Sequence, residues 1–164
     1  MTRAMLRRAA SETDGRLRLG AGLMTLAAVG FVGYAVIFFI RNFTDAFLEL
    51  GIGRGQVDVG RDQIAAFSPS LMHYIAHLQI AVSGFIAATG VAVAALAWFG
   101  VRRGERWAWI AAVAAPVLGL AVALPAHYPY GFATLGHLGL IYAATAVFVV
   151  GALLALPAVW RTGR

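Results

Sequence analysis

The sequence contains no cysteine and no lysine among its 164 residues, and it has only seven carboxylate side chains. The absence of cysteine excludes disulfides, thiolate metal sites, covalent haem attachment and cysteine nucleophiles. Any metal or haem must therefore be held by nitrogen, oxygen or thioether ligands. All thirteen basic residues are arginine. That usage indicates a GC-rich bacterial genome and implies no mechanism.

Charged residues are scarce, at 12% of the chain, whereas soluble domains carry roughly 25%. The hydrophobic fraction is 61% and the mean hydropathy is +0.80. This composition excludes a soluble globular domain and indicates an integral membrane protein with the lipid bilayer as its first partner. A pI near 10.8 would suggest nucleic acid in a soluble chain. Here the arginines flank apolar segments, so we expect no nucleic-acid partner.

Four apolar segments have about the 20 residues that a bilayer-crossing helix needs. They cover residues 19–40, 69–101, 107–124 and 135–159. We predict an all-α, polytopic four-helix bundle that forms a single membrane domain over 1–164, with an outer connection over 41–68. The first segment is longer than a signal-peptide core and lacks an evident cleavage site, so we expect a retained helix. Pro116 predicts a kink in the third segment.

The arginines predict the direction of the bundle. Ten of them lie in the two terminal segments and in the turn between the second and third spans: Arg3, Arg7, Arg8, Arg16, Arg18, Arg102, Arg103, Arg106, Arg161 and Arg164. The positive-inside rule makes that side cytoplasmic. Both termini are then inside, the connection 41–68 faces out, and the location is the bacterial cytoplasmic (inner) membrane.

Small residues recur at steps of three and four on two of the spans. They are Ala27, Gly30 and Gly33 on the first, and Ala108, Ala112, Ala115, Gly119 and Ala123 on the third. Such stripes let helices approach closely in lipid. They predict a tight bundle.

All four histidines lie at the predicted outer ends of spans. At about 100° per residue, His73 and His77 share a face with Ile80, Gly84, Ala88 and Val91, and His137 shares one with Ile141, Ala144, Phe148, Gly151 and Ala155. His127 follows the third span. These periodicities predict imidazoles that turn toward the bundle axis at similar depth.

A cluster of this kind suits two cofactors. The HxxxH spacing puts two imidazoles on one helix face, as transition-metal sites require, and imidazole is also the usual axial ligand of haem b. We therefore expect a transition metal or haem on His73, His77, His127 and His137, with Asp45, Glu49, Asp58 and Asp62 as supporting groups. The alternative is that the histidines only form hydrogen bonds. The carboxylates would then pair with Arg41, Arg54 and Arg61 in solvent.

The connection predicts short helical pieces. Thr44 is placed to cap DAFLEL, Asp62 falls in the first turn of RDQIAAF, and Ser68 with Pro69 reads as the start of the second span. Its apolar side chains predict a lid over the mouth of the bundle: Phe43, Phe47, Leu48, Ile64 and Phe67.

Three stretches resemble a group of small, mostly uncharacterised bacterial four-span membrane proteins of broadly DoxX-like appearance. They are SPSLMHYIAHLQIAVSG, WFGVRRGERWAW and HYPYGFATLGHLG. The resemblance covers about residues 68 to 158 and implies the four-span fold. In similar sequences an acidic residue follows the second histidine of the pair. Leu78 stands there in this chain, so the resemblance transfers no catalytic role.

Three functions remain open. The first is a membrane protein whose outer histidine cluster binds a transition metal or haem. The second is an accessory or assembly subunit, with no chemistry of its own, that packs against membrane partners or forms a homo-oligomer. The third is a lipid-, quinone- or isoprenoid-binding protein or enzyme with histidines as acid and base. No charged residue lies inside any span, which argues against ion pumps and charged-substrate transporters. The sequence does not decide whether the protein is an enzyme.

Overall fold

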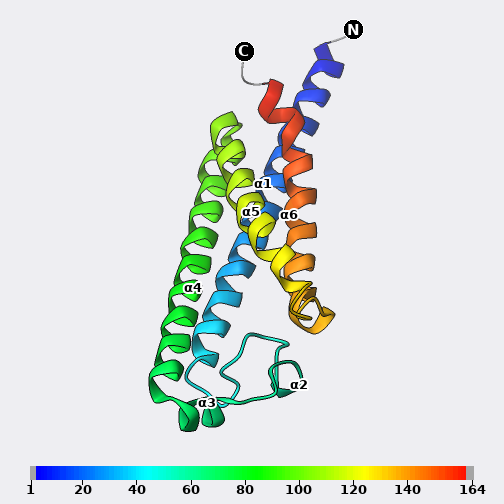
Figure 1. Ribbon diagram of the computed structural model, residues 1–164. Coiled ribbons are helices and arrows are strands. Elements are labelled where there is room, and N and C mark those ends of the chain that lie inside the picture. The colour runs from blue at the N-terminus through cyan, green and yellow to red at the C-terminus, as the bar shows by residue number, and fades with distance from the viewer. Residues whose placement is uncertain (1–2, 162–164) are drawn as a thin grey trace.

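The computed structural model describes residues 3–161, with side chains from Glu12 on, and every regular element in that range is helical (Figure 1). The long helices are α1 (Arg3–Arg41), α4 (Pro69–Ala95), α5 (Arg106–His127) and α6 (Leu135–Arg161). The connection after α1 holds two short helices, α2 (Arg54–Val57) and α3 (Arg61–Phe67). Beyond α4 the chain continues through a π-helical turn, Leu96–Gly100, and a 3-10 turn, Val101–Arg103.

Four helices are long and apolar enough to cross a membrane, which confirms the all-α prediction and its four spans. The candidate spans are Glu12–Arg41, Pro69–Arg103, Arg106–His127 and Leu135–Arg161. In Figure 1, α1 begins and α6 ends at one end of the bundle, here called the terminal end. The connection with α2 and α3 lies at the opposite, loop end. The cytoplasmic direction stays a prediction, and Arg164 and the side chains of Arg3, Arg7 and Arg8 lie outside the described residues.

Helix α1 packs along both α4 and α6. Its closest approach to α6 is made by two glycines. A Cβ on Gly20 would lie 2.5 Å from the Gly151 carbonyl oxygen, and one on Gly151 would lie 2.7 Å from the Gly20 carbonyl oxygen. Against α4, a Cβ on Gly90 would lie 3.0 Å from the Ala28 carbonyl oxygen. Contacts between backbones are how helices associate in lipid, where apolar side chains gain little from burial.

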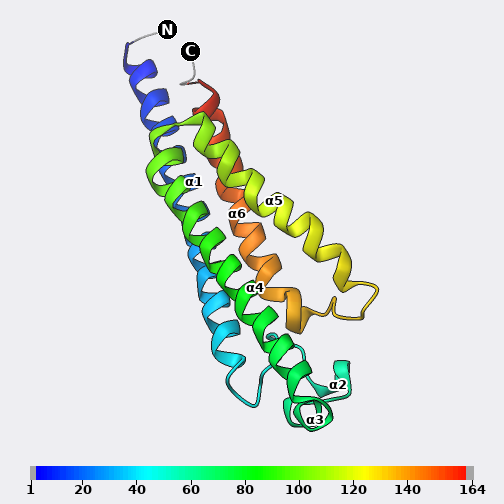
Figure 2. The same cartoon turned by 60° about the vertical axis from the view of Figure 1, so that its left-hand side comes forward.

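The buried apolar core lies toward the terminal end. It comprises Leu17, Ala21, Met24, Ala28, Val93, Ala97, Val101, Ala108, Ala112, Ala152, Ala155, Ala158 and Val159. Helix α5 joins this core near its start, where Trp109 Nε1 donates to the Ala152 carbonyl at 3.1 Å. Farther along, α5 leans away from α4 (Figure 2).

Two of the predicted small-residue stripes were therefore wrong in part. Gly119 and Ala123 are exposed, because the second half of α5 has no helix against that face. On α1, Ala27 is buried but Gly30 and Gly33 are exposed. The bundle is tight at its terminal half and opens toward its loop half. Pro116 lies within α5, which is helical from Arg106 to His127.

The helix predictions for the connection are confirmed near its end, at Asp62 and Ser68, but were wrong near its start, after Thr44. Asp62 lies in the first turn of α3, and Ser68 caps α4 by accepting from the Leu71 N–H at 3.3 Å, with Pro69 as the first helical residue. The segment DAFLEL, however, forms irregular turns in place of a helix.

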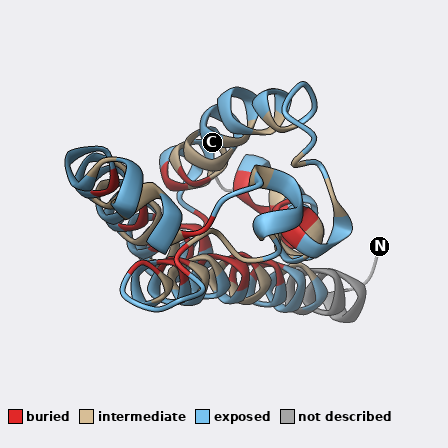
Figure 3. Cartoon of the chain, turned by 60° about the horizontal axis from the view of Figure 1, so that its bottom comes forward, coloured by how far each residue is buried: buried red, intermediate tan, exposed pale blue. Residues whose placement is uncertain are grey.

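The lid prediction was wrong for two of its aromatic residues. Phe47 is 1% exposed, but Phe43 and Phe67 are 59% and 84% exposed. Figure 3 views the molecule from the loop end, where buried residues of the connection lie between the helix ends. The connection thus covers the mouth of the bundle with Phe47 and with backbone.

Candidate metal centre

Two of the four histidines meet at the loop end. His127 is the last residue of α5 and His137 lies in the first turn of α6. Their rings are stacked, with centroids 5.0 Å apart and planes inclined by 30°. The two Nε2 atoms are 3.1 Å apart. His137 is 1% exposed and His127 is half-buried.

Glu49, from the connection, completes a group of three. Its Oε2 atom is 3.4 Å from His137 Nε2. One ligand atom from each of Glu49, His127 and His137 lies within 4.8 Å of the other two. In the described part of the chain, this is the one group of three or more histidine or acidic side chains close enough to share a metal ion.

The start of α6 is fixed by Thr134. Its carbonyl accepts from the Leu138 N–H at 2.8 Å, and its Oγ1 accepts from the His137 N–H at 3.3 Å. This is the contact of an N-capping threonine, which satisfies amides that have no partner within the helix. The cap sets where the first turn begins. His137 therefore faces the connection.

The connection approaches His137 through its backbone. His137 Nδ1 lies 2.8 Å from the Leu50 carbonyl oxygen. The next residue, Gly51, has φ +79°, and a Cβ there would collide with the Gly136 carbonyl. Glycine alone tolerates both the positive φ and the close approach. Gly51 therefore lets the chain lie against the start of α6 and deliver the Leu50 carbonyl.

Arg41, the last residue of α1, holds the segment that carries Glu49. Its Nε donates to the Leu48 carbonyl at 2.8 Å, and its Nη2 donates to the carbonyls of Ala46 at 3.1 Å and Glu49 at 3.5 Å. The rigid fork of a guanidinium suits several acceptors at once. Arg41 thus holds the non-helical segment DAFLEL through three of its carbonyls.

The hydrogen bonds of both histidines define their tautomers. A carbonyl oxygen only accepts, so His137 Nδ1 must carry a proton toward Leu50. The same holds for His127 Nδ1, which lies 2.8 Å from the Ala123 carbonyl oxygen. In the neutral imidazole the other nitrogen is then unprotonated. With both imidazoles neutral, two Nε2 lone pairs face each other across 3.1 Å, an arrangement that a shared proton or a metal ion would relieve.

Two separations within the group match those of ligands on one metal ion. Two atoms each about 2.1 Å from an ion, at an angle between about 95° and 109°, lie about 3.1–3.4 Å apart. The distance between the two Nε2 atoms is 3.1 Å, and that from His137 Nε2 to Glu49 Oε2 is 3.4 Å. The Nδ1–H bonds to carbonyls are also the usual outer contacts of metal-bound histidine.

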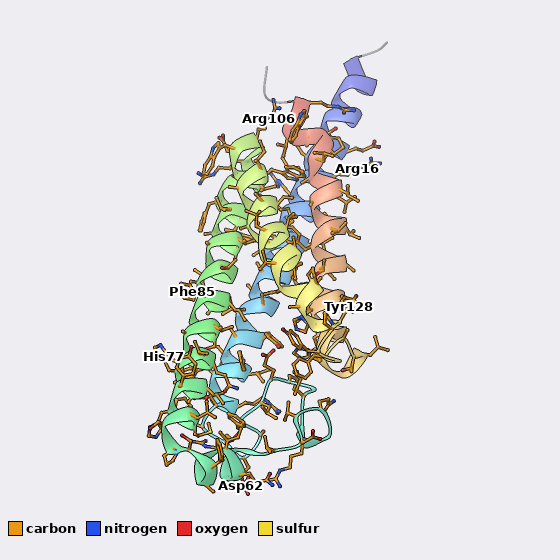
Figure 4. All side chains as sticks on the ribbon, in the orientation of Figure 1. Arg16, Asp62, His77, Phe85, Arg106 and Tyr128 are labelled. Atoms are coloured by element: carbon orange, nitrogen blue, oxygen red, sulfur yellow. The ribbon has the colours of Figure 1, made fainter. Side chains whose placement is uncertain are left out.

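His73 and His77 do not face the bundle axis, and that prediction was wrong. Both side chains are exposed on α4, whose buried face is formed by Met72, Ser83, Gly90 and Val93. In Figure 4, His77 and Tyr128, the neighbour of His127, lie on opposite sides of the molecule. Small residues occur on several faces of α4. A Cβ on Gly84 would meet nothing within 4 Å, so the stripe of small residues pointed to the wrong face.

The other predicted carboxylates also lie apart from the group. Asp45 and Asp58 are exposed. Asp62 pairs with Arg54 at 2.7 Å on the surface, as the alternative interpretation of the connection expected. Sequence reasoning missed the parts played by Arg41, Gly51 and Thr134. Of these, the role of Thr134 could have been predicted, because threonine just before an apolar span is a common N-cap residue.

Comparison with protein-family models, with curated proteins and with solved structures found no match. The DoxX-like resemblance stays a prediction.

Proposed function

We propose that the protein binds a divalent transition-metal ion at the loop end of its membrane bundle, through His127 Nε2, His137 Nε2 and the Glu49 carboxylate. The observation that carries this proposal is the pair of Nε2 atoms 3.1 Å apart, with a carboxylate oxygen 3.4 Å from one of them, while both Nδ1 atoms are directed at carbonyl oxygens. Two neutral imidazoles that carry their protons on Nδ1 would offer, with the carboxylate, three electron-pair donors to one ion.

A metal ion suits this group better than a shared proton does. A proton on His137 Nε2 points at one acceptor, whereas three donor atoms within 4.8 Å of one another can all bind one ion. Haem is disfavoured by the same distances. Two axial histidines stand on opposite sides of the iron, about 4 Å apart with the macrocycle between them, and the stacked rings of His127 and His137 leave no such space.

The ligand set narrows the choice of ion. Two imidazoles and one carboxylate are typical of zinc sites with an open position and of non-haem ferrous sites. Three protein ligands leave at least one coordination position for water or another ligand. We therefore expect zinc or ferrous iron in a site that can bind an exogenous group.

We place the site on the extracytoplasmic side. The described arginines at the terminal end support this: two of them stack on tryptophans, Arg102 at 4.3 Å from the Trp98 ring centroid and Arg106 at 4.4 Å from that of Trp160. Arginine is enriched on the cytoplasmic side, and tryptophan lies at membrane interfaces on either side. The metal site lies at the other end.

The test is metal binding by purified protein in detergent, measured as metal content by mass spectrometry and as affinity for Zn²⁺ by dialysis. We expect one equivalent per chain. Replacing a ligand, as in His137→Ala, His127→Ala or Glu49→Gln, lowers the affinity by more than about 100-fold, since outer-shell changes alone cost about 10–100-fold.

The chain supplies matched controls for these variants. His73→Ala and His77→Ala remove an imidazole from exposed positions outside the group, and Asp62→Asn removes an exposed carboxylate. All three should bind Zn²⁺ like the wild type. Equal affinity across both sets, or no binding by a wild-type protein whose helical circular dichroism is intact, contradicts the proposal. An absorption spectrum with a haem band does so as well.

A further inference from the structure

A groove runs between α1 and α6 in the half of the bundle that opens. It has a volume of about 450 Å³. Its lining is apolar apart from one tyrosine and includes Leu26, Tyr34 and Ile37 of α1 and Leu140, Ile141 and Val147 of α6. Tyr34 contributes the one polar side-chain group. A Cβ on Gly30 or Gly33 would meet nothing within 4 Å, so these two glycines leave the groove open.

The groove ends about one helical turn from residues of the metal centre. Leu140 and Ile141 follow His137 by three and four residues, which places them one helical turn away on the same face. On α1, Ile37 is one turn before Arg41, whose guanidinium bonds to the Glu49 carbonyl. The three proposed metal ligands and the apolar groove are thus neighbours at the loop end of α1 and α6.

The length of the groove matches one leaflet of a bilayer. From Leu26 to Ile37 it follows α1 for about 16 Å at 1.5 Å per residue, and half of a hydrocarbon core is about 15 Å. Both walls belong to candidate membrane spans. Water in such a groove would lack the two to four polar partners that hold it in place. A hydrocarbon chain is the occupant that this lining fits.

The positive charge at the loop end of the groove favours a lipid with a negatively charged head group. A divalent ion bound to the Glu49 carboxylate keeps one net positive charge, and Arg41 adds a second beside it. An ion with three protein ligands also has a position open for an oxygen donor. Phosphate oxygens provide both the negative charge and the donor atom.

From these observations we infer that the groove and the metal centre form one binding site for an anionic phospholipid of the outer leaflet. One acyl chain lies between α1 and α6, and a phosphate oxygen takes the open position on the metal. This inference rests on the proposed function, because the phosphate needs the ion. A second copy of this chain and a partner helix are the competing occupants.

The experiment uses the full chain in detergent, loaded with Zn²⁺ and mixed with phosphatidylglycerol that carries a diazirine in one acyl chain. Irradiation and peptide mass spectrometry then map the attached lipid. We expect attachment within residues 26–37 and 140–147. Gly30→Leu and Gly33→Leu place a side chain in the space that the acyl chain would occupy and should lower attachment about tenfold, which corresponds to about 1.4 kcal/mol of binding free energy. Gly119→Leu makes the same change at an exposed position and should leave attachment unchanged.

Competition on the wild-type protein tests the head group without relying on any variant. Unlabelled phosphatidylglycerol should displace the probe, and diacylglycerol with the same chains should displace it about tenfold less well, because it lacks the phosphate. Removal of zinc by a chelator should reduce the difference between these two lipids.

The zinc content of each sample separates the two proposals. If zinc is bound but the lipid attaches evenly around the bundle, or attaches equally to Gly30→Leu and wild type, the lipid inference fails and the metal site stands. Failure to displace the probe with phosphatidylglycerol, because a second copy covers the groove, also overturns the lipid inference. If no zinc is bound, the proposed function itself fails.

Discussion

The two halves of this bundle use glycine in opposite ways. In the terminal half, Gly20 and Gly151 bring α1 and α6 so close that a Cβ on either would lie 2.5–2.7 Å from the carbonyl oxygen of the other. In the loop half, Gly30 and Gly33 line a groove and have open space where a Cβ would stand. The same residue type closes one half of the helix pair and opens the other. Composition alone therefore does not distinguish a packed interface from a binding groove.

The halves also differ in where their polar groups come from. The terminal half has an apolar core made of small side chains. The loop half acquires Glu49 and the Leu50 carbonyl from a connection outside the spans, and His137 at 1% exposure depends on them. Stability and metal binding should then be separable by mutation.

The largest effect is expected from Gly151→Leu in the terminal half. Its side chain would have to enter the space of the Gly20 carbonyl and of Leu23, whose Cβ is 2.9 Å from the site of a Cβ on residue 151. Backbone cannot yield as a flexible side chain does, so we expect a cost at or above the usual 1–3 kcal/mol of overpacking. Thermal unfolding in detergent, followed by circular dichroism, measures it.

Gly119→Leu is the matched control, because α5 offers open space at that position. If both variants unfold at the same temperature, the close approach of α1 and α6 does not hold the bundle together, and the distinction between the two halves is lost.

The next largest effect is expected from Gly51→Ala in the loop half. The new methyl group would meet the Gly136 carbonyl, and φ of +79° is unfavourable for alanine. The connection must move and withdraw the Leu50 carbonyl from His137. In the proposed site that carbonyl orients a metal ligand, so we expect Zn²⁺ affinity to fall about 10–100-fold. Equilibrium dialysis measures the affinity, and the unfolding temperature should change less than in Gly151→Leu. A protein with normal zinc binding would contradict the role given to Leu50.

A smaller effect is expected from Arg41→Met. Methionine keeps the apolar stem but removes the donors to the carbonyls of Ala46, Leu48 and Glu49. Glu49 then stays on a less ordered segment and loses part of its preorganisation for the ion. We expect Zn²⁺ affinity to fall about tenfold, at the lower end of outer-shell effects. Isothermal titration would record the loss mainly as a less favourable entropy of binding, and an unchanged affinity would show that Glu49 is positioned without Arg41.

The sequence predicted correctly those features that depend on residues close to one another along the chain. Bilayer thickness requires long apolar runs, so the four spans could be found by length alone. The start of α4 followed from Ser68 and Pro69, which act through their own backbone geometry. The inward face of α6 was also predicted, because His137, Gly151 and Ala155 are buried.

What failed depends on tertiary placement. The small residues of α4 occur on more than one face, so periodicity could not tell whether Gly84 or Gly90 faces α1. His127 and His137 come together because of the path of the chain between the end of α5 and the start of α6. No local sequence pattern predicts that path. Glu49 was one of four acidic residues of the connection that the sequence offered as equal candidates for the group. Glu49 is brought to the histidines by the hydrogen bonds of Arg41 and by the close packing of Gly51 against Gly136. Both are tertiary contacts that the sequence does not reveal.

The smallest effect is expected from Arg54→Met, on the outer surface of the same connection. Arg54 Nη2 lies 2.7 Å from Asp62 Oδ1, but the two side chains are 64% and 71% exposed, and exposed pairs contribute about 0–1 kcal/mol. Salt screens what remains. We expect the unfolding temperature to change little and Zn²⁺ affinity to stay within about twofold, which is the range of such a small energy. Asp62→Asn should behave alike, since it breaks the same pair from the other side. If Arg54→Met instead lowers zinc affinity as much as Arg41→Met does, the whole connection acts as one unit, and the metal centre depends on more of the loop half than the contacts of Arg41, Leu50 and Gly51.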